Sequence, residues 1–324
     1  MDSSTTMYIP TYNDVLAAHE RIRPYVHRTP VLTSSYLDGL AGAELFFKCE
    51  NFQKAGAFKV RGACNAVFGL SEADAKRGVA THSSGNHALS LTYAAGRRGI
   101  KATVVMPETA PKAKMDAVRG YGGEVITCAP STEARERTLE ALVDRTGAEF
   151  VHPYNDHRVI AGQGTCSREL LEEVGELDAV VAPIGGGGMI SGTCLTLSNI
   201  APDTKVYAAE PKNADDAWRS LKAGHIIEDD APQTVADGLK VSLRERTFHF
   251  VSSYVTDILL VSEEEIVSAM RLVWQRMKIV IEPSSAVAVA AVLKNPGLFA
   301  GRRVGVILTG GNVDLDKLPW INKA

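Results

Sequence analysis

The chain has 324 residues, of which 45% are hydrophobic and 23% charged, and its formal net charge at pH 7 is -3. This composition is typical of a folded globular protein with one large core or two domains, and it excludes general disorder. The weak net charge removes the usual electrostatic reason to expect nucleic acid or an anionic membrane as a partner. We therefore expect small solutes as ligands.

Nothing in the sequence directs the chain to a membrane or to an oxidising compartment. The N-terminal segment has no basic stretch followed by an apolar one, and no later apolar run is long enough to cross a bilayer, so we expect a cytoplasmic protein. The cysteines lack CxxC or Cys/His spacing, which predicts buried thiols in place of disulfides or a zinc site. They are Cys49, Cys64, Cys128, Cys166 and Cys194.

Short β-rich runs alternate with helical segments along most of the chain. The predicted elements follow one another at 78–84, 86–99, 102–108, 112–122, 124–129 and 131–147, and then at 178–184, 205–210, 262–278 and 303–309. This alternation predicts βαβ units and open, twisted, mostly parallel sheets of an α/β fold. Ligands of such sheets bind beyond the carboxyl ends of the strands, so the loops there are the candidate sites.

Four consecutive glycines follow the predicted strand at 178–184, namely Gly185, Gly186, Gly187 and Gly188. They let the backbone approach an anion, and the helix that follows adds unpaired amide donors, which favours a phosphate site over a flexible turn. A dinucleotide site is the alternative, because Glu210 ends the next strand roughly 20 residues on. The GxGxxG spacing fails, however, since the sixth position is Ile190 or Ser191.

Lys59 lies between apolar residues, in AFKVRGA, at the predicted start of a helix. Desolvation and the positive end of a helix both disfavour the ammonium form, so this lysine can act as a neutral amine and form a Schiff base. Taken alone, a lysine that merely extends to solvent is the alternative.

Two other strand ends carry polar groups. The segment THSSGNH at 81–87 offers hydroxyls, an amide and backbone donors that suit a substrate carboxylate, although Ser83 or Ser84 can also serve as an ordinary helix cap. Thr309 ends the last predicted strand with a hydroxyl that suits a ring nitrogen, and a turn into the following glycines is the alternative.

Together these four segments resemble the fold type II pyridoxal-phosphate enzymes, specifically the serine racemase and serine/threonine dehydratase group. The resemblance covers about 22–314 and includes HRTPVLTSSYL, VIAGQGT, PIGGGGMISG, ADGLK, IEPSSAV and LTGGNVD. It implies two open, twisted, mostly parallel sheets, one in a large discontinuous domain of 1–77 and 153–324 and one in a small domain of 78–152. It also implies a homodimer.

The resemblance implies roles for the residues singled out above. Lys59 would carry pyridoxal 5'-phosphate, with the ring of Phe58 beside it and Asn86 on the 3-oxygen of the cofactor. The phosphate would be held by Gly185, Gly186, Gly187, Gly188 and Met189. Thr309 would face the pyridine nitrogen, where the family often has serine.

The substrate carboxylate would be lined by Ser83, Ser84, Asn86 and His87, with Ser84 as a second base opposite Lys59. Glu210, the carbonyl of Ala214 and Asp216 resemble the divalent-cation site of the racemase branch, and oxygen ligands suit Mg, Mn or Ca. An acidic helix start is the alternative for that segment.

The implied reaction is dehydration and deamination of a β-hydroxy amino acid, with 3-hydroxyaspartate as the preferred candidate and L-serine or L-threonine as neighbouring ones. By resemblance Arg135 and Lys114 approach the substrate mouth and suit a second carboxylate, with solvated surface charge as the alternative. Tyr154 stands where the racemase pattern has asparagine, and its segment with the LDKLPW ending is similar to bacterial 3-hydroxyaspartate dehydratases. Serine racemase with an L-serine dehydratase side activity is the alternative.

Overall fold

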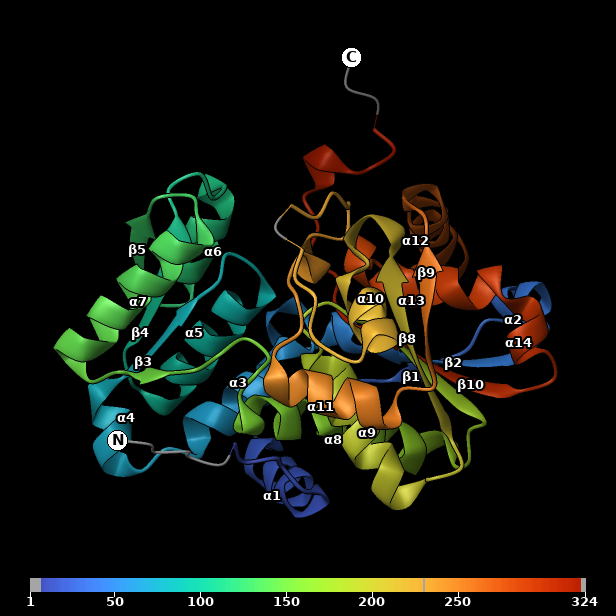
Figure 1. Ribbon diagram of the computed structural model, residues 1–324, viewed down its shortest axis with the longest axis horizontal. Helices are drawn as coiled ribbons and strands as arrows, with labels where there is room; N and C mark the ends of the chain where they lie inside the picture. The colour runs from blue at the N-terminus through green and yellow to red at the C-terminus, as the bar shows by residue number, and fades with distance from the viewer. Residues whose placement is uncertain (1–6, 230, 322–324) are drawn as a thin grey trace.

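The structure, a computed structural model, describes residues 7–229 and 231–321 and contains two sheets (Figure 1). The larger sheet has six strands, in the order β1 (Val31–Leu32), β2 (Glu44–Cys49), β10 (Arg303–Leu308), β7 (Ala179–Pro183), β8 (Lys205–Pro211) and β9 (Asp257–Val261). The smaller sheet has four, in the order β5 (Glu124–Cys128), β4 (Ala102–Pro107), β3 (Val79–His82) and β6 (Glu149–Phe150).

The predicted fold class is confirmed. Every strand pair in the two sheets is parallel except β1 with β2, which is antiparallel. All four strands of the smaller sheet fall within 78–152. We keep that range as a proposed small domain, with 1–77 and 153–324 as the large one.

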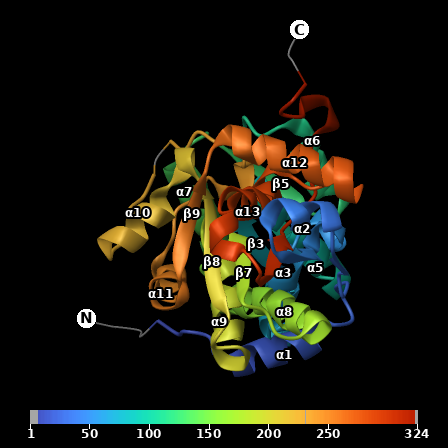
Figure 2. The same cartoon turned by 90° about the vertical axis from the view of Figure 1, so that its right-hand side faces the viewer.

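Helices pack against both sheets, and on the larger sheet they cover both faces. They are α1 (Tyr12–Ile22), α2 (Ser35–Ala41), α3 (Lys59–Phe68), α4 (Glu72–Arg77), α5 (Asn86–Arg98), α6 (Lys112–Gly120), α7 (Thr132–Thr146), α8 (His157–Val174), α9 (Gly188–Ile200), α10 (Asp216–Ala223), α11 (Glu245–Tyr254), α12 (Glu263–Met277), α13 (Pro283–Lys294) and α14 (Pro296–Phe299). Figure 2 shows α12 and α13 on one side of the strands and α8 and α9 on the other.

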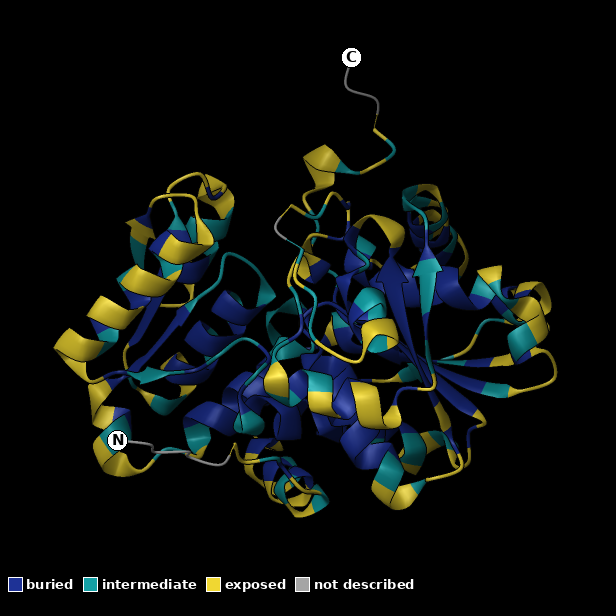
Figure 3. Ribbon diagram, viewed as in Figure 1, coloured by how far each residue is buried: buried dark blue, intermediate teal, exposed yellow. Residues whose placement is uncertain are grey.

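The two faces bury different cores. Along β7, Val181 packs with the apolar residues of α12 and α13, whereas its neighbour Val180 packs with those of α8 and α9. Successive side chains of a strand point to opposite faces, so a strand covered on both sides is buried and apolar throughout, as β7 is. Figure 3 shows the middle of this sheet in the colour of buried residues. Because both faces of the sheet are covered by apolar side chains, polar functional groups are expected beyond the carboxyl ends of the strands.

The five cysteines are free and buried, which confirms that they form no disulfides. Burial raises the pKa of the Cys49 and Cys64 thiols to about 12, so they act as small apolar residues. Within the described ranges, no helix combines the length and apolar character needed to cross a bilayer.

Candidate active site

Lys59 is the first residue of α3 and reaches from the larger sheet toward the chain that leaves the smaller one. Its Nζ donates to the Pro153 carbonyl oxygen at 2.8 Å and lies 5.1 Å from the centre of the Phe58 ring. Desolvation lowers the pKa of Lys59 to about 8, although the negative charge of Glu282 opposes this shift. A substantial neutral fraction near physiological pH is what an amine nucleophile or base requires.

Buried charges hold the first turn of α3 in place. The fully buried Arg61 donates from Nε to Glu50 at 2.7 Å and from Nη2 to Glu169, also at 2.7 Å. Lys48 donates to the same carboxylate of Glu169 at 2.8 Å. Two cations thus neutralise two carboxylates, a balance that buried ion pairs require, and the network fixes the helix that begins with Lys59.

Asn86, predicted to contact the 3-oxygen of a cofactor ring, begins α5 and is oriented by two groups that sequence reasoning gave no role. Its Nδ2 donates to both carboxylate oxygens of Glu282, at 3.0 and 3.1 Å, and its Oδ1 accepts from Asn312 Nδ2 at 2.9 Å. The Asn312 backbone amide also donates to Glu282 at 3.2 Å. Glu282 lies in the segment IEPSSAV and Asn312 in LTGGNVD, two segments that carry the resemblance, and this is the sequence signal that could have identified them.

Glu282 has no cationic partner among the described ion pairs. Desolvation raises its pKa to about 7, and the hydrogen bonds from Asn86 and Asn312 oppose that rise. A buried acid with a pKa raised toward neutrality, bonded to Asn86 and acting electrostatically on Lys59, is typical of a functional site.

The glycine loop is shaped by close packing. Gly187 has a φ of +83°, in the left-handed region, and α9 begins at the next residue. A Cβ on Gly186 would lie 2.5 Å from the ring of Tyr154, and one on Gly185 would lie 2.8 Å from the Cα of Leu239. The loop therefore requires glycine, and its amides at the start of α9 form a cradle that fits a phosphate group.

Thr309 lies buried at the end of β10, next to the start of α3. Its carbonyl accepts from the Phe58 amide at 2.9 Å, and its hydroxyl lies 3.1 Å from the hydroxyl of Ser285. Ser285 in turn accepts from the Gly310 amide at 2.7 Å. The position predicted to face a pyridine nitrogen is thus a neutral, hydrogen-bonded hydroxyl, and Ser285 is a support that sequence reasoning missed.

The predicted substrate segment lies between β3 and α5. Ser83 and Ser84 are partly exposed there, and Ser83 Oγ accepts from the Gly85 amide at 3.3 Å. His87 is buried, and its Nε2 bonds to the Val151 carbonyl oxygen at 3.0 Å. Desolvation lowers the pKa of His87 to about 3, so the imidazole is neutral and can offer a ligand a dipole but not a positive charge.

The predicted cation ligands lie together at the end of β8. Glu210 accepts from the amides of Ala217 and Trp218, both at 2.9 Å, while Asp216 Oδ2 is buried without a hydrogen-bond partner in the described part of the chain. Burial raises the pKa of Asp216 to about 6, and burial with repulsion from Asp216 raises that of Glu210. Two close buried acids with an unpaired oxygen fit a divalent cation.

The cations predicted at the substrate mouth differ in their surroundings. Lys114 is paired with Asp237 at 2.9 Å. Arg135 donates only to the Thr132 hydroxyl at 2.9 Å among its described side-chain contacts, and its charge lowers the pKa of His82 after desolvation. Arg135 therefore remains the better candidate of the two.

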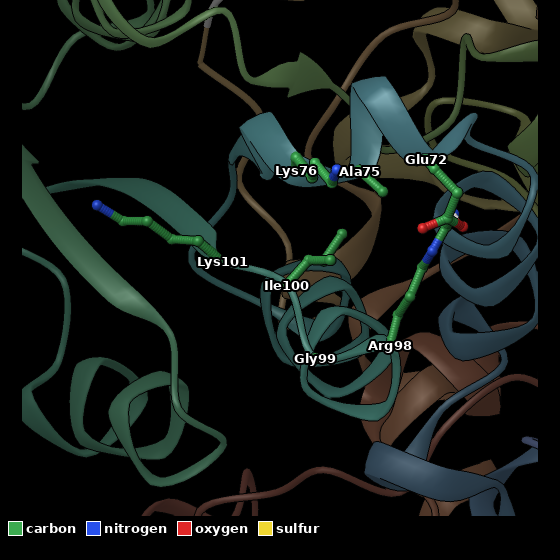
Figure 4. Close-up of a pocket in the computed structure, with 7 residues that line it drawn as sticks. All are labelled: Glu72, Ala75, Lys76, Arg98, Gly99, Ile100 and Lys101. Carbon is green, nitrogen blue, oxygen red and sulfur yellow. Dashed lines mark hydrogen bonds and ion pairs between the residues drawn. The ribbon is translucent and has the colours of Figure 1, made fainter.

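A surface hollow of about 460 Å³ lies elsewhere, between α4 and the end of α5 (Figure 4). Its lining includes the Arg98–Glu72 ion pair, whose atoms are 2.8 Å apart. None of the residues discussed above lines it, so it is separate from the site of Lys59.

Comparisons with known proteins agree with this geometry. The model of the family described as "Pyridoxal-phosphate dependent enzyme" matches residues 22–310. A β-hydroxyaspartate dehydratase of Paracoccus denitrificans is 68% identical over 97% of this chain and 100% of its own, and a serine racemase of Dictyostelium discoideum is 49% identical over 96% and 97%.

Solved structures agree as well. The crystal structure of serine racemase from Dictyostelium discoideum has a TM-score of 0.91 with 49% identity, covering 94% of this chain and 99% of its own. The crystal structure of T.th. threonine deaminase has a TM-score of 0.90 with 44% identity, over 94% and 99%.

Proposed function

The chain belongs to the family of pyridoxal-phosphate dependent enzymes, and from that premise we propose that it eliminates water from 3-hydroxyaspartate, after which hydrolysis of the dehydrated product releases ammonia and gives oxaloacetate. The observation that carries the proposal is the 68% identity to a β-hydroxyaspartate dehydratase across nearly the whole chain. The predicted family, the fold type and the interpretation as an enzyme of the dehydratase and racemase kind are confirmed by the same comparisons.

The residues present fit the cofactor. Lys59 would carry it, the amides of the loop from Gly185 to Met189 would hold its phosphate, and Asn86 and Thr309 would contact its ring. When bound, pyridoxal phosphate supplies the electron sink that allows an amino acid to lose its Cα proton. The cradle of close-packed glycines and the lysine amine with a lowered pKa support this assignment.

The side chains of this chain then supply the proton transfers and the orientation. Lys59 would take the Cα proton, and a pKa of about 8 suits a base that works near neutral pH. The first turn of α5, with Ser83, Ser84 and the neutral His87, would hold the α-carboxylate. Thr309 would place a neutral hydroxyl, and no charged group, next to the pyridine nitrogen of the cofactor.

Serine racemase with L-serine dehydratase side activity is the second candidate. It is supported less well, because the serine racemase relative is 49% identical and the dehydratase relative 68%. We propose Ser84 as the second base that racemisation would need. Replacing Ser84 by alanine should then reduce racemisation more than elimination.

We propose in addition that Glu210, the Ala214 carbonyl and Asp216 bind Mg, Mn or Ca, and that the chain forms a homodimer. The unpaired Asp216 Oδ2 supports the cation. The dimer and the cytoplasmic location stay predictions from the sequence.

The test of the function is product release by cofactor-loaded protein. L-serine, L-threonine and each stereoisomer of 3-hydroxyaspartate are offered separately, keto acid and ammonia are measured, and the remaining substrate is analysed for chirality. We expect oxaloacetate from one hydroxyaspartate isomer to dominate. Preferential turnover of serine with accumulating D-serine would instead support the racemase.

A further inference from the structure

Arg244 is a cation that sequence reasoning did not select, and it connects the two halves of the molecule. It precedes α11, whose residues Phe250 and Val251 pack in the core beside the larger sheet. Its Nη2 lies 3.9 Å from Glu136 on α7, and α7 packs against the smaller sheet. Its Nη1 pairs with Glu228 at 2.6 Å. Arg244 thus lies where the two halves meet.

Tyr154 joins Arg244 to the glycine loop. The tyrosine is 8% exposed, and its ring packs so closely on Gly186 that a Cβ there would lie 2.5 Å away. Burial raises the pKa of Tyr154, and the neighbouring Arg244 guanidinium opposes this rise. The Tyr154 side chain therefore lies between the Arg244 guanidinium and the glycine loop. Tyr154 also directly follows Pro153, whose carbonyl oxygen accepts the hydrogen bond from Lys59.

Two histidines also lie on this surface, next to Tyr154. The ring of His82, the last residue of β3, lies 6.2 Å from that of His152, which follows β6, and the centres of the His152 and Tyr154 rings are 4.6 Å apart. Desolvation is the main cause that lowers the pKa of both imidazoles, to about 3 for His152, and the charge of Arg244 adds to the shift of each. Glu136 opposes the shift at His82, and Asp156 opposes it at His152. With both imidazoles neutral, Arg244 is a cation that acts on both of them.

We propose that Arg244 determines substrate specificity by binding the second carboxylate of a dicarboxylic β-hydroxy amino acid, with Tyr154 holding the guanidinium in place. The proposal rests on the proposed function and deepens it. A guanidinium pairs with a carboxylate through two parallel hydrogen bonds, which a serine or threonine side chain cannot accept. Arg244 thereby distinguishes 3-hydroxyaspartate from the monocarboxylic substrates of related enzymes.

The carboxylates that pair with Arg244 in this structure, Glu228 and Glu136, can be replaced by the carboxylate of a substrate. The side chains of Glu228 and Glu136 are 53% and 54% exposed, and ion pairs at such positions are weak because water screens them. A substrate carboxylate that enters between the two halves is better shielded, so its pairing with Arg244 is favoured over the exposed one.

The first test compares Arg244→Gln with wild-type protein on 3-hydroxyaspartate and on L-serine. Removing a charge-assisted hydrogen bond should lower kcat/KM for 3-hydroxyaspartate by about 10- to 100-fold, mainly through KM, while kcat/KM for L-serine changes by less than about 3-fold. Arg28→Gln is the matched control, because Arg28 is likewise partly exposed and paired with a glutamate, Glu172, at 2.8 Å. It should leave both substrates unaffected.

A binding measurement and a second variant separate specificity from folding. L-Aspartate has no β-hydroxyl to eliminate, so its equilibrium binding can be followed through the cofactor absorbance and compared with that of L-alanine. Arg244→Gln should weaken L-aspartate binding and leave L-alanine binding unchanged. Tyr154→Phe keeps the ring on Gly186 and should show a smaller loss of the same kind.

The outcomes distinguish the two proposals. If wild-type protein turns over L-serine and not 3-hydroxyaspartate, the proposed function itself fails. If wild-type protein prefers 3-hydroxyaspartate and Arg244→Gln keeps that preference, or loses both substrates equally, the role of Arg244 is overturned while the function stands.

Discussion

Asn86 and Glu282 are 196 residues apart in the sequence, and the amide of one donates to both carboxylate oxygens of the other, at 3.0 and 3.1 Å. The contact joins the start of α5, beside the smaller sheet, to the start of α13, on the larger one. Because Asn86 is the proposed contact of the cofactor's 3-oxygen, Glu282 sets which way that amide points. It is a positioning residue for the site.

Glu282→Gln should change how stability depends on pH. The pKa of Glu282 is raised from 4.5 to about 7 in the folded chain, so the folded state holds a proton that the unfolded state has released between these values. Wild-type protein should therefore lose stability relative to the variant as pH rises from about 4.5 to about 7, by on the order of 3 kcal/mol. Urea unfolding of both proteins across this range measures the difference, and parallel curves would contradict the raised pKa.

Cofactor uptake should report the state of Lys59. Its amine must be unprotonated to react with the carbonyl carbon of pyridoxal phosphate, and its pKa is lowered to about 8. The uptake rate, followed by absorbance after mixing cofactor-free protein with cofactor, should rise with pH up to about 8 and then level off. A rise that continues to the ordinary lysine value of 10.5 would show that desolvation does not activate this amine.

Gly186→Ala tests the glycine cradle. The added methyl group would meet the Tyr154 ring at 2.5 Å, and overpacking of this kind costs about 1–3 kcal/mol. We expect weaker cofactor binding by about tenfold or more, measured by equilibrium titration. Gly39→Ala is the control, because no atom lies within 4 Å of a Cβ there and its φ is not positive. Equal cofactor affinity in both variants would remove the phosphate assignment.

Cation binding should appear as thermal stabilisation. Adding Mg, Mn or Ca to chelator-treated protein should raise Tm, because a ligand that binds only the folded state stabilises it. Asp216→Asn should abolish the increase, while Asp203→Asn, at an exposed turn, should keep it. An unchanged increase in Asp216→Asn would place the cation elsewhere.

Local patterns in the sequence predict part of this arrangement well. Strand and helix alternation predicts β3, β4, β5, β7, β8 and β10 because each is an apolar run bounded by turn residues. β6 has only two residues and β1 also two, too few for any periodicity to show. These two strands form because they pair with longer strands, β1 with β2 and β6 with β3.

The groups that orient the site could not be predicted in the same way. Glu282, Ser285 and Arg244 act through contacts with segments distant in the chain, and a single sequence contains no signal of such a contact. Arg61 is a second example. From the sequence an arginine is expected to be a solvated surface charge, but Arg61 is fully buried and paired with Glu50 and Glu169. The resemblance to the family predicts which residues form the site, and the fold shows which groups those residues contact.

If Lys59 carries out the elimination on 3-hydroxyaspartate, the most direct measurement is oxaloacetate release by wild-type protein and by Lys59→Ala under the same cofactor-saturated conditions. Lys112→Ala, at an exposed position on α6, controls for the loss of a lysine. We predict full release by wild-type protein and the control, and none above the protein-free rate from Lys59→Ala. Release by Lys59→Ala at a rate near that of wild-type protein would contradict the account.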